Sequence, residues 1–245
     1  MNEIFNRARL LFGDDHMERL AAMRVIIFGA GGVGSWCAEA LVRTGVGHLT
    51  VVDNDVVSIT NVNRQMMATM QTVGQVKVDA LRERLLAINP DADIVARREV
   101  FCATTAADFG LEDYDVIVDC IDSLTDKALL IETATRMPGR FFSSMGAALK
   151  TDPTQVRVAE FWKVRGCPLA RALRQRFKRR GVYPARKFQC VYSEEQGRNV
   201  AANIAADEGG LAAYGSTRKV AVNGSLMTVT ATFGLTLASL ILAPR

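Results

Sequence analysis

The sequence predicts an α/β fold built on a doubly wound, mostly parallel sheet with helices on both faces. Two observations carry this prediction. Apolar runs typical of buried strands alternate with helical patterns from residue 24 to about residue 150. A glycine-rich turn joins the first of these strands to the helix that follows it. The chain of 245 residues, 49% hydrophobic and 23% charged, is long and apolar enough to bury the core of such a domain.

The first strand and the turn after it have the form of a nucleotide-binding site. Residues 24–28 (RVIIF) are almost wholly apolar, as expected of a strand buried on both faces of a parallel sheet. Three glycines with G-x-G-x-x-G spacing form the turn: Gly29, Gly31 and Gly34. A helix is expected at 34–43, and a second apolar strand, 48–52, ends in Asp53 at the distance typical of a ribose-binding carboxylate. This arrangement predicts a Rossmann-like site, where backbone N–H groups approach a phosphate at the start of a helix.

The remaining elements continue the alternation. Three further strands are expected, at 93–98, 115–119 and 140–144. Two further helices are expected, at 74–88 and 125–136. Residues 1–23 read as one or two helices before the first strand. We therefore expect a nucleotide-binding core over 24–150 within a single domain of 1–245.

Beyond residue 150 the alternation fades, and a basic helical and loop extension is expected over 151–245. A strand is expected at 156–161 and a helix with one narrow apolar stripe at 168–180. Residues 184–222, rich in glycine, alanine and short polar residues, read as a long mobile connection. The last apolar run, 225–242, is expected to be a buried closing helix, because its many hydroxyl residues disfavour a membrane span. Peripheral membrane contact stays open.

Positive charge is concentrated in this extension. Residues 161–193 hold ten lysines and arginines and no acidic residue, whereas the whole chain has 30 basic and 26 acidic residues. Such a run either attracts a phosphate backbone or is only a solvated face. The cations of the expected helix are the candidate nucleic-acid contacts: Arg171, Arg174, Arg176, Lys178, Arg179 and Arg180. Two nearby aromatic residues, Trp162 and Tyr183, would either stack on bases or pack in the core.

The cysteines and the first residues indicate where the protein works. Five cysteines are scattered with no C-x-x-C pair, which predicts reduced thiols in the cytoplasm and no four-cysteine zinc site. The first twenty residues mix charges throughout and have no apolar signal core, so secretion is not expected.

The glycine turn alone leaves two nucleotides open, a dinucleotide for hydride transfer or ATP. A triphosphate needs cations for its phosphates and a carboxylate for magnesium. Arg64 and Lys77 are the candidate cations, and Asp122, just after the strand expected at 115–119, is the candidate carboxylate. Taken singly, each cation also reads as a solvated surface charge.

Taken together, these motifs resemble a known family. The stretches "GAGGVGSWCAEALVRTGVGHLTVVDNDVVSITNVNRQ", "VGQVKV" and "DCIDS" are similar to the ATP-dependent, ThiF-type activating enzymes related to ubiquitin activation. The resemblance covers about residues 7–150 and implies ATP, Mg²⁺ and a site that adenylates a carboxylate. It implies a nucleotide-binding set: Gly29, Gly31, Gly32, Gly34, Asp53, Asp55, Asn61, Arg64, Lys77 and Asp122. It also implies a homodimer, in which the catalytic residues Arg64, Lys77 and the magnesium-linked Asp122 are joined by Arg7 of the neighbouring subunit.

The resemblance leaves two carboxylate substrates in competition. The C-terminal stretches "TDPTQVRVAEF", "CPLARALRQRFKRRGV", "QCVYSEE" and "MTVTATFG" are similar to the branch that dehydrates threonylcarbamoyladenosine in tRNA. The alternative is the C-terminus of a ubiquitin-like sulfur-carrier protein. A sulfur-transfer partner and a monovalent cation stay open. Some relatives carry a cysteine before the last helix, whereas residues 217–225 have none here. Cys190 is therefore either a reactive thiol or, as we expect, a buried one.

Overall fold

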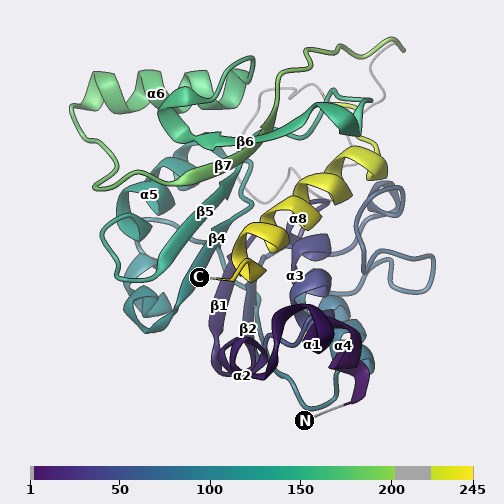
Figure 1. The fold of residues 1–245 in the computed structure, drawn as a ribbon. Coiled ribbons are helices and arrows are strands. Elements are labelled where there is room, and N and C mark those ends of the chain that lie inside the picture. The colour runs from purple at the N-terminus through teal and green to yellow at the C-terminus, as the bar shows by residue number, and fades with distance from the viewer. Residues whose placement is uncertain (1–2, 202–221, 245) are drawn as a thin grey trace.

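One sheet organises the molecule. The computed structural model describes residues 3–201 and 222–244, and within them seven strands lie in the order β3-β2-β1-β4-β5-β7-β6 (Figure 1). Their bounds are β1 Arg24–Phe28, β2 His48–Val52, β3 Asp93–Arg97, β4 Val116–Asp119, β5 Arg140–Ser144, β6 Val156–Glu160 and β7 Gln189–Ser193. Neighbouring strands are parallel except for β6 and β7. The predicted mostly parallel sheet is confirmed.

Helices cover both faces of this sheet (Figure 1). One face carries α3 (Gly34–Arg43), α4 (Lys77–Ile88) and α8 (Met227–Leu242), and the other carries α5 (Leu124–Ala134) and α6 (Pro168–Arg180). Within β1, Val25 and Ile27 pack into the first of these cores, whereas Ile26 and Phe28 pack into the second. This burial on both faces explains why the strand is apolar at successive positions. Two short helices, α1 (Asn6–Phe12) and α2 (Asp14–Ala22), precede β1.

Two expectations are wrong in part: where one helix begins, and what the segment 184–222 forms. The helix expected at 74–88 begins at Lys77, because Val76 is extended and pairs with Val56 in an antiparallel bridge. The segment 184–222 is not simply a connection, since its residues Gln189–Ser193 form β7, an inner strand between β5 and β6. The rest of that prediction falls largely on residues 202–221, which lie outside the described residues.

The last apolar run forms the closing helix, as predicted. The α8 helix packs closely on α3: a Cβ atom on Gly234 would lie only 2.4 Å from Val33 O and 2.9 Å from Cys37 N. A larger residue would separate the two helices. Across the part of the chain that the structure describes, we find no helix with the length and hydropathy needed to cross a membrane.

Candidate active site

The site lies where the strand order reverses. From β1 the chain builds the sheet outward through β2 and β3, and it then returns to add β4 on the other side of β1. In open α/β sheets, ligands bind outside the carboxyl ends of the strands at such a point. The ends of β1 and β4 are in direct contact there, because a Cβ atom on Gly29 would lie 2.7 Å from Cys120 O.

The glycines of the turn have different roles. Gly29 has φ +94°, a conformation that residues with a Cβ atom rarely adopt. A Cβ atom on Gly34 would lie 1.8 Å from Gly29 O, so the loop closes only on glycine. Beside Gly32, α8 approaches with Thr230, 3.2 Å from the position of a Cβ atom. Next to Gly31 a Cβ atom would find no neighbour closer than 4.0 Å, which leaves space for a ligand to approach the backbone.

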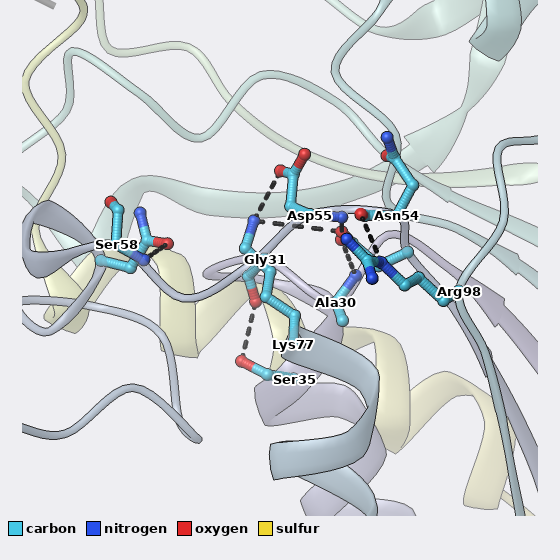
Figure 2. A network of polar contacts seen from close by, with 10 residues as sticks. Ala30, Gly31, Ser35, Asn54, Asp55, Ser58, Lys77 and Arg98 are labelled. Atoms are coloured by element: carbon cyan, nitrogen blue, oxygen red, sulfur yellow. Dashed lines mark hydrogen bonds and ion pairs between the residues drawn. The ribbon is translucent and has the colours of Figure 1, made fainter. Parts of the chain in front are cut away.

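Asp53, Asp55 and Lys77 form a charged cluster beside this loop. Figure 2 shows Asp55 and Lys77 next to Ala30 and Gly31. The Asp53 carboxylate, at the end of β2, accepts hydrogen bonds from the N–H groups of Ala30 (2.8 Å) and Asp55 (2.9 Å). The Lys77 ammonium, at the start of α4, lies 2.7 Å from Asp55 Oδ2 and 4.0 Å from Asp53 Oδ1. Burial raises the pKa of Asp53, and Lys77 acts against that rise. Lys77 is only 6% exposed, so a buried cation stands next to the loop.

Arg64 and Asp122 lie close enough to interact electrostatically. Burial lowers the pKa of the Arg64 guanidinium, and the Asp122 carboxylate works in the opposite direction. The Arg64 Nη1 atom donates to two groups of its own loop, Thr60 O at 2.9 Å and Asn63 Oδ1 at 3.0 Å. Asp122 is exposed and follows β4. A cation and an accessible carboxylate thus stand at the same sheet edge as the glycine turn.

Asn61 has a local structural role. It is buried, and its Oδ1 atom accepts a hydrogen bond from Ser58 N at 3.1 Å, which closes the short turn Ile59–Asn61. Its amide nitrogen makes no hydrogen bond within residues 3–201 and 222–244, and it is the kind of donor that a phosphate needs.

The comparisons with known proteins agree with this arrangement. The model of the ThiF family matches residues 5–243. The chain belongs to the ThiF family. It is 38% identical over 191 residues to the tRNA threonylcarbamoyladenosine dehydratase of Bacillus subtilis, covering 78% of this chain and 74% of that protein. The protein of the same name from Escherichia coli is 36% identical over 196 residues, covering 78% and 73%.

Solved structures extend the likeness over nearly the whole chain. The complex of Escherichia coli TcdA with AMP has a TM-score of 0.83 at 30% identity and covers 98% of this chain and 94% of that one. The complex of the same protein with ATP has a TM-score of 0.80 and covers 98% and 93%. The likeness therefore includes most of the C-terminal region that follows β5.

Of the residues predicted for the nucleotide site, Arg7 lies apart from the rest in this ThiF-family chain. It is exposed on α1, and the preceding Phe5 lies against Gly45 at the carboxyl end of α3. The glycine turn lies at the amino end of α3, and a helix of 10 residues spans about 15 Å. Within a single chain, Arg7 is thus remote from the turn.

The ThiF-family site also contains a buried ion pair that the sequence did not reveal. Asp119, at the end of β4, and Lys127, in α5, are both 0% exposed, and Lys127 Nζ lies 2.8 Å from Asp119 Oδ2. Ser143 Oγ donates to the same carboxylate at 2.7 Å. Ile121 is held at both ends of its backbone, because its N–H donates to Asp119 (3.0 Å) and its carbonyl accepts from Lys127 (2.8 Å). The pair fixes the turn that carries Asp122.

The cations of α6 divide into structural and accessible groups. Arg174 donates to two backbone carbonyls, Phe161 O at 3.0 Å and Val164 O at 2.9 Å, and Arg180 pairs with Glu132. Arg176 has a buried Nε atom without a partner among the described residues. Three cations of this helix are exposed and have no ion pair within the described chain: Arg171, Lys178 and Arg179.

The structure shows whether Trp162, Tyr183 and Cys190 are exposed or buried. Trp162 and Tyr183 are 40% and 49% exposed, with ring centres 6.1 Å apart, so neither is packed in the core. Cys190 is 0% exposed in β7, and burial raises the pKa of its thiol well above the usual range. The expectation that Cys190 is a buried thiol is confirmed, and its burial argues against a reactive role.

Proposed function

We propose that this ThiF-family protein is an ATP-dependent tRNA threonylcarbamoyladenosine dehydratase. The observation that carries the proposal is the likeness over 98% of the chain to TcdA of Escherichia coli, whose structures contain AMP and ATP. The site geometry supports it, because the open glycine turn and the buried Lys77 offer the N–H groups and the cation that bind a triphosphate.

The proposed reaction activates a carboxylate and then closes a ring. An oxygen of the threonyl carboxylate attacks the α-phosphorus of ATP, and the bond to pyrophosphate breaks. The neighbouring carbamoyl group attacks the carbonyl of the resulting acyl adenylate, loses a proton to solvent and expels AMP. The nucleoside has then lost one water. Because the nucleophile belongs to the same molecule, proximity favours ring closure without a covalent enzyme intermediate.

The residues of the site divide this work between binding and charge stabilisation. In the proposal, the Gly29–Gly34 turn and the Asn61 amide bind phosphate oxygens, and Asp53 accepts hydrogen bonds from the ribose. Lys77, now paired with Asp55, and Arg64 stabilise the negative charge that develops as pyrophosphate leaves. Both cations are partly or fully buried, which strengthens their interaction with a phosphate.

A magnesium ion fits the residues at hand. No group of three or more histidine, cysteine or acidic side chains suited to a metal occurs among the described residues. Mg²⁺ in nucleotide sites commonly takes only one or two carboxylates, with phosphates and waters completing its shell. The exposed Asp122 carboxylate suits this mode. When bound there, the ion would neutralise charge on the phosphates.

The proposed tRNA surface is the exposed face of α6. This helix begins at the carboxyl edge of the sheet, since a Cβ atom on Gly146, after β5, would lie 3.8 Å from Leu169 and 4.0 Å from Cys167. Of the exposed cations, Arg171 lies in the first turn of α6, near this edge, whereas Lys178 and Arg179 lie in its last turn. Nucleic acid held by all three would run along the helix away from the sheet edge.

We also propose a homodimer in which Arg7 reaches the γ-phosphate bound by the neighbouring subunit. Two observations support an intermolecular contact. Arg7 is remote from the nucleotide site of its own chain, and two leucines on the same helix are largely exposed, Leu10 at 82% and Leu11 at 83%.

The test is to incubate the protein with ATP, Mg²⁺ and tRNA that carries threonylcarbamoyladenosine, and to weigh the digested nucleosides. The expected result is the loss of one water from that nucleoside, only when ATP is present. Asp122→Asn should slow the conversion about 100-fold or more, whereas Asp126→Asn, in the first turn of the α5 helix that follows, should not. The proposal would be contradicted if the mass of the nucleoside did not change while the same protein released pyrophosphate from ATP when given a sulfur-carrier protein.

A further inference from the structure

Gln65 is a buried amide with an unused hydrogen-bonding atom beside the glycine turn. Its side chain is 6% exposed, and its Oε1 atom has no hydrogen-bond partner among the described residues. Its Nε2 atom is the nearest atom, at 4.0 Å, to the position of a Cβ atom on Gly31. Folded proteins rarely leave a buried polar atom unpaired, and such an atom indicates a use that the isolated fold does not satisfy.

The position of Gln65 is set by its two neighbours in the chain. The carbonyl of the preceding residue accepts a hydrogen bond from Trp36 Nε1 at 3.0 Å. The N–H of the following residue donates to Ser35 Oγ at 3.1 Å, and Ser35 Oγ donates to Gly31 O at 2.7 Å. Both neighbours are therefore tied to the first turn of α3. The amide is held against the glycine turn before any ligand arrives, as a binding group should be.

We propose that Gln65 donates a side-chain N–H to a phosphate group of ATP that lies over Gly31, the glycine to which its Nε2 atom is nearest. This inference rests on the proposed function, because it adds a contact to the same nucleotide site. The amide nitrogen of a carboxamide carries two N–H donors, so it can make such a contact without a charge. Arg64 and Lys77 supply charge, whereas Gln65 supplies a directed, neutral contact.

The variant Gln65→Met separates this role from a structural one. Methionine has nearly the same length and removes both polar atoms. Without nucleotide, the Tm should stay unchanged or rise, because an unpaired buried atom has been replaced by an apolar one. With ATP, the dissociation constant should increase about tenfold or more, and the rise in Tm that ATP produces should shrink. Gln71→Met, an exposed glutamine on the same loop, is the matched control and should change neither quantity.

The measurements are calorimetric titration of the full chain with ATP and thermal unfolding with and without ATP. If Gln65→Met does not fold, Gln65→Asn tests the same contact, because its shorter amide withdraws the donor, and it should weaken ATP binding similarly. Wild-type affinity in either folded variant would overturn the inference and leave the proposed function intact. Failure of the wild-type protein itself to bind ATP would overturn both.

Discussion

Replacing Lys127 with methionine should destabilise the fold strongly, although the residue is not expected to touch a substrate. Lys127 and Asp119 are both fully buried and 2.8 Å apart. Lys127→Met leaves the Asp119 carboxylate buried without a cation, which typically costs about 3–5 kcal/mol. Because Ser143 and the Ile121 N–H still donate to this carboxylate, we expect a loss of about 3 kcal/mol, the lower end of that range.

A second variant isolates the charge. Adding Asp119→Asn to Lys127→Met removes both ions but leaves a side-chain oxygen to accept from Ser143. The double variant should therefore be more stable than Lys127→Met alone, by about 1 kcal/mol or more. Urea unfolding followed by circular dichroism measures both differences.

The stability lost in Lys127→Met should also depend on pH. Burial already raises the pKa of Asp119 against the opposing effect of Lys127, and removing Lys127 raises that pKa further. A carboxyl group with a raised pKa in the folded state binds its proton more tightly there than in the unfolded chain. Lowering the pH from 7 to 5 should therefore reduce the difference between Lys127→Met and wild type. If Lys127→Met lost less than about 1 kcal/mol of stability at pH 7, the unpaired buried carboxylate would not carry the predicted cost. A difference in stability from wild type that grows as the pH falls would contradict the same explanation.

Four further predictions rest on other contacts in the structure. Gly31→Ala should fold with normal stability but bind ATP at least about tenfold more weakly, whereas Gly34→Ala should disrupt the turn and reduce stability as well; thermal unfolding and ATP titration distinguish them. Arg174→Ala should cost about 1–3 kcal/mol of stability, because two backbone carbonyls lose their donor. Lys178→Ala should leave stability unchanged and reduce the slope of tRNA affinity against salt by about 1. Alkylation of Cys102 by iodoacetamide should be half-maximal near pH 7, because hydrogen bonds to Thr104 and Thr105 lower the pKa of its thiol to about 7; half-maximal alkylation near pH 9 would contradict this.

Local patterns predict most of the elements and fail where tertiary pairing decides. The strands at 24–28, 48–52 and 140–144 have the expected bounds. The first is an almost wholly apolar run, whereas 140–144 (RFFSS) holds only two apolar residues. The strand β7 is only five residues long and follows a basic stretch, so nothing local distinguishes it from a connection. Its place between β5 and β6 comes from the sheet itself. The start of α4 is displaced for a similar reason, since Val76 pairs in an isolated bridge with Val56, which belongs to no strand of the sheet.

Some residues of the candidate site can likewise be predicted from the sequence, and others cannot. The glycine spacing and Asp53 can be predicted, because the backbone turn requires them. The ion pair of Asp119 with Lys127 and the unpaired amide of Gln65 are not readable, because their meaning depends on burial by elements far away in the sequence. The position of Thr230 against Gly32 likewise requires α8 to be docked.

If ATP activates the substrate carboxylate by adenylation, one carboxylate oxygen passes to AMP, and an isotope label follows that oxygen. The threonyl carboxylate of the modified tRNA is labelled with ¹⁸O, one turnover with ATP is allowed, and the released nucleotide is weighed. The expected product is AMP that carries one ¹⁸O atom, because the bridging oxygen of the acyl adenylate leaves with AMP. Unlabelled AMP, or ADP as the product, would contradict it.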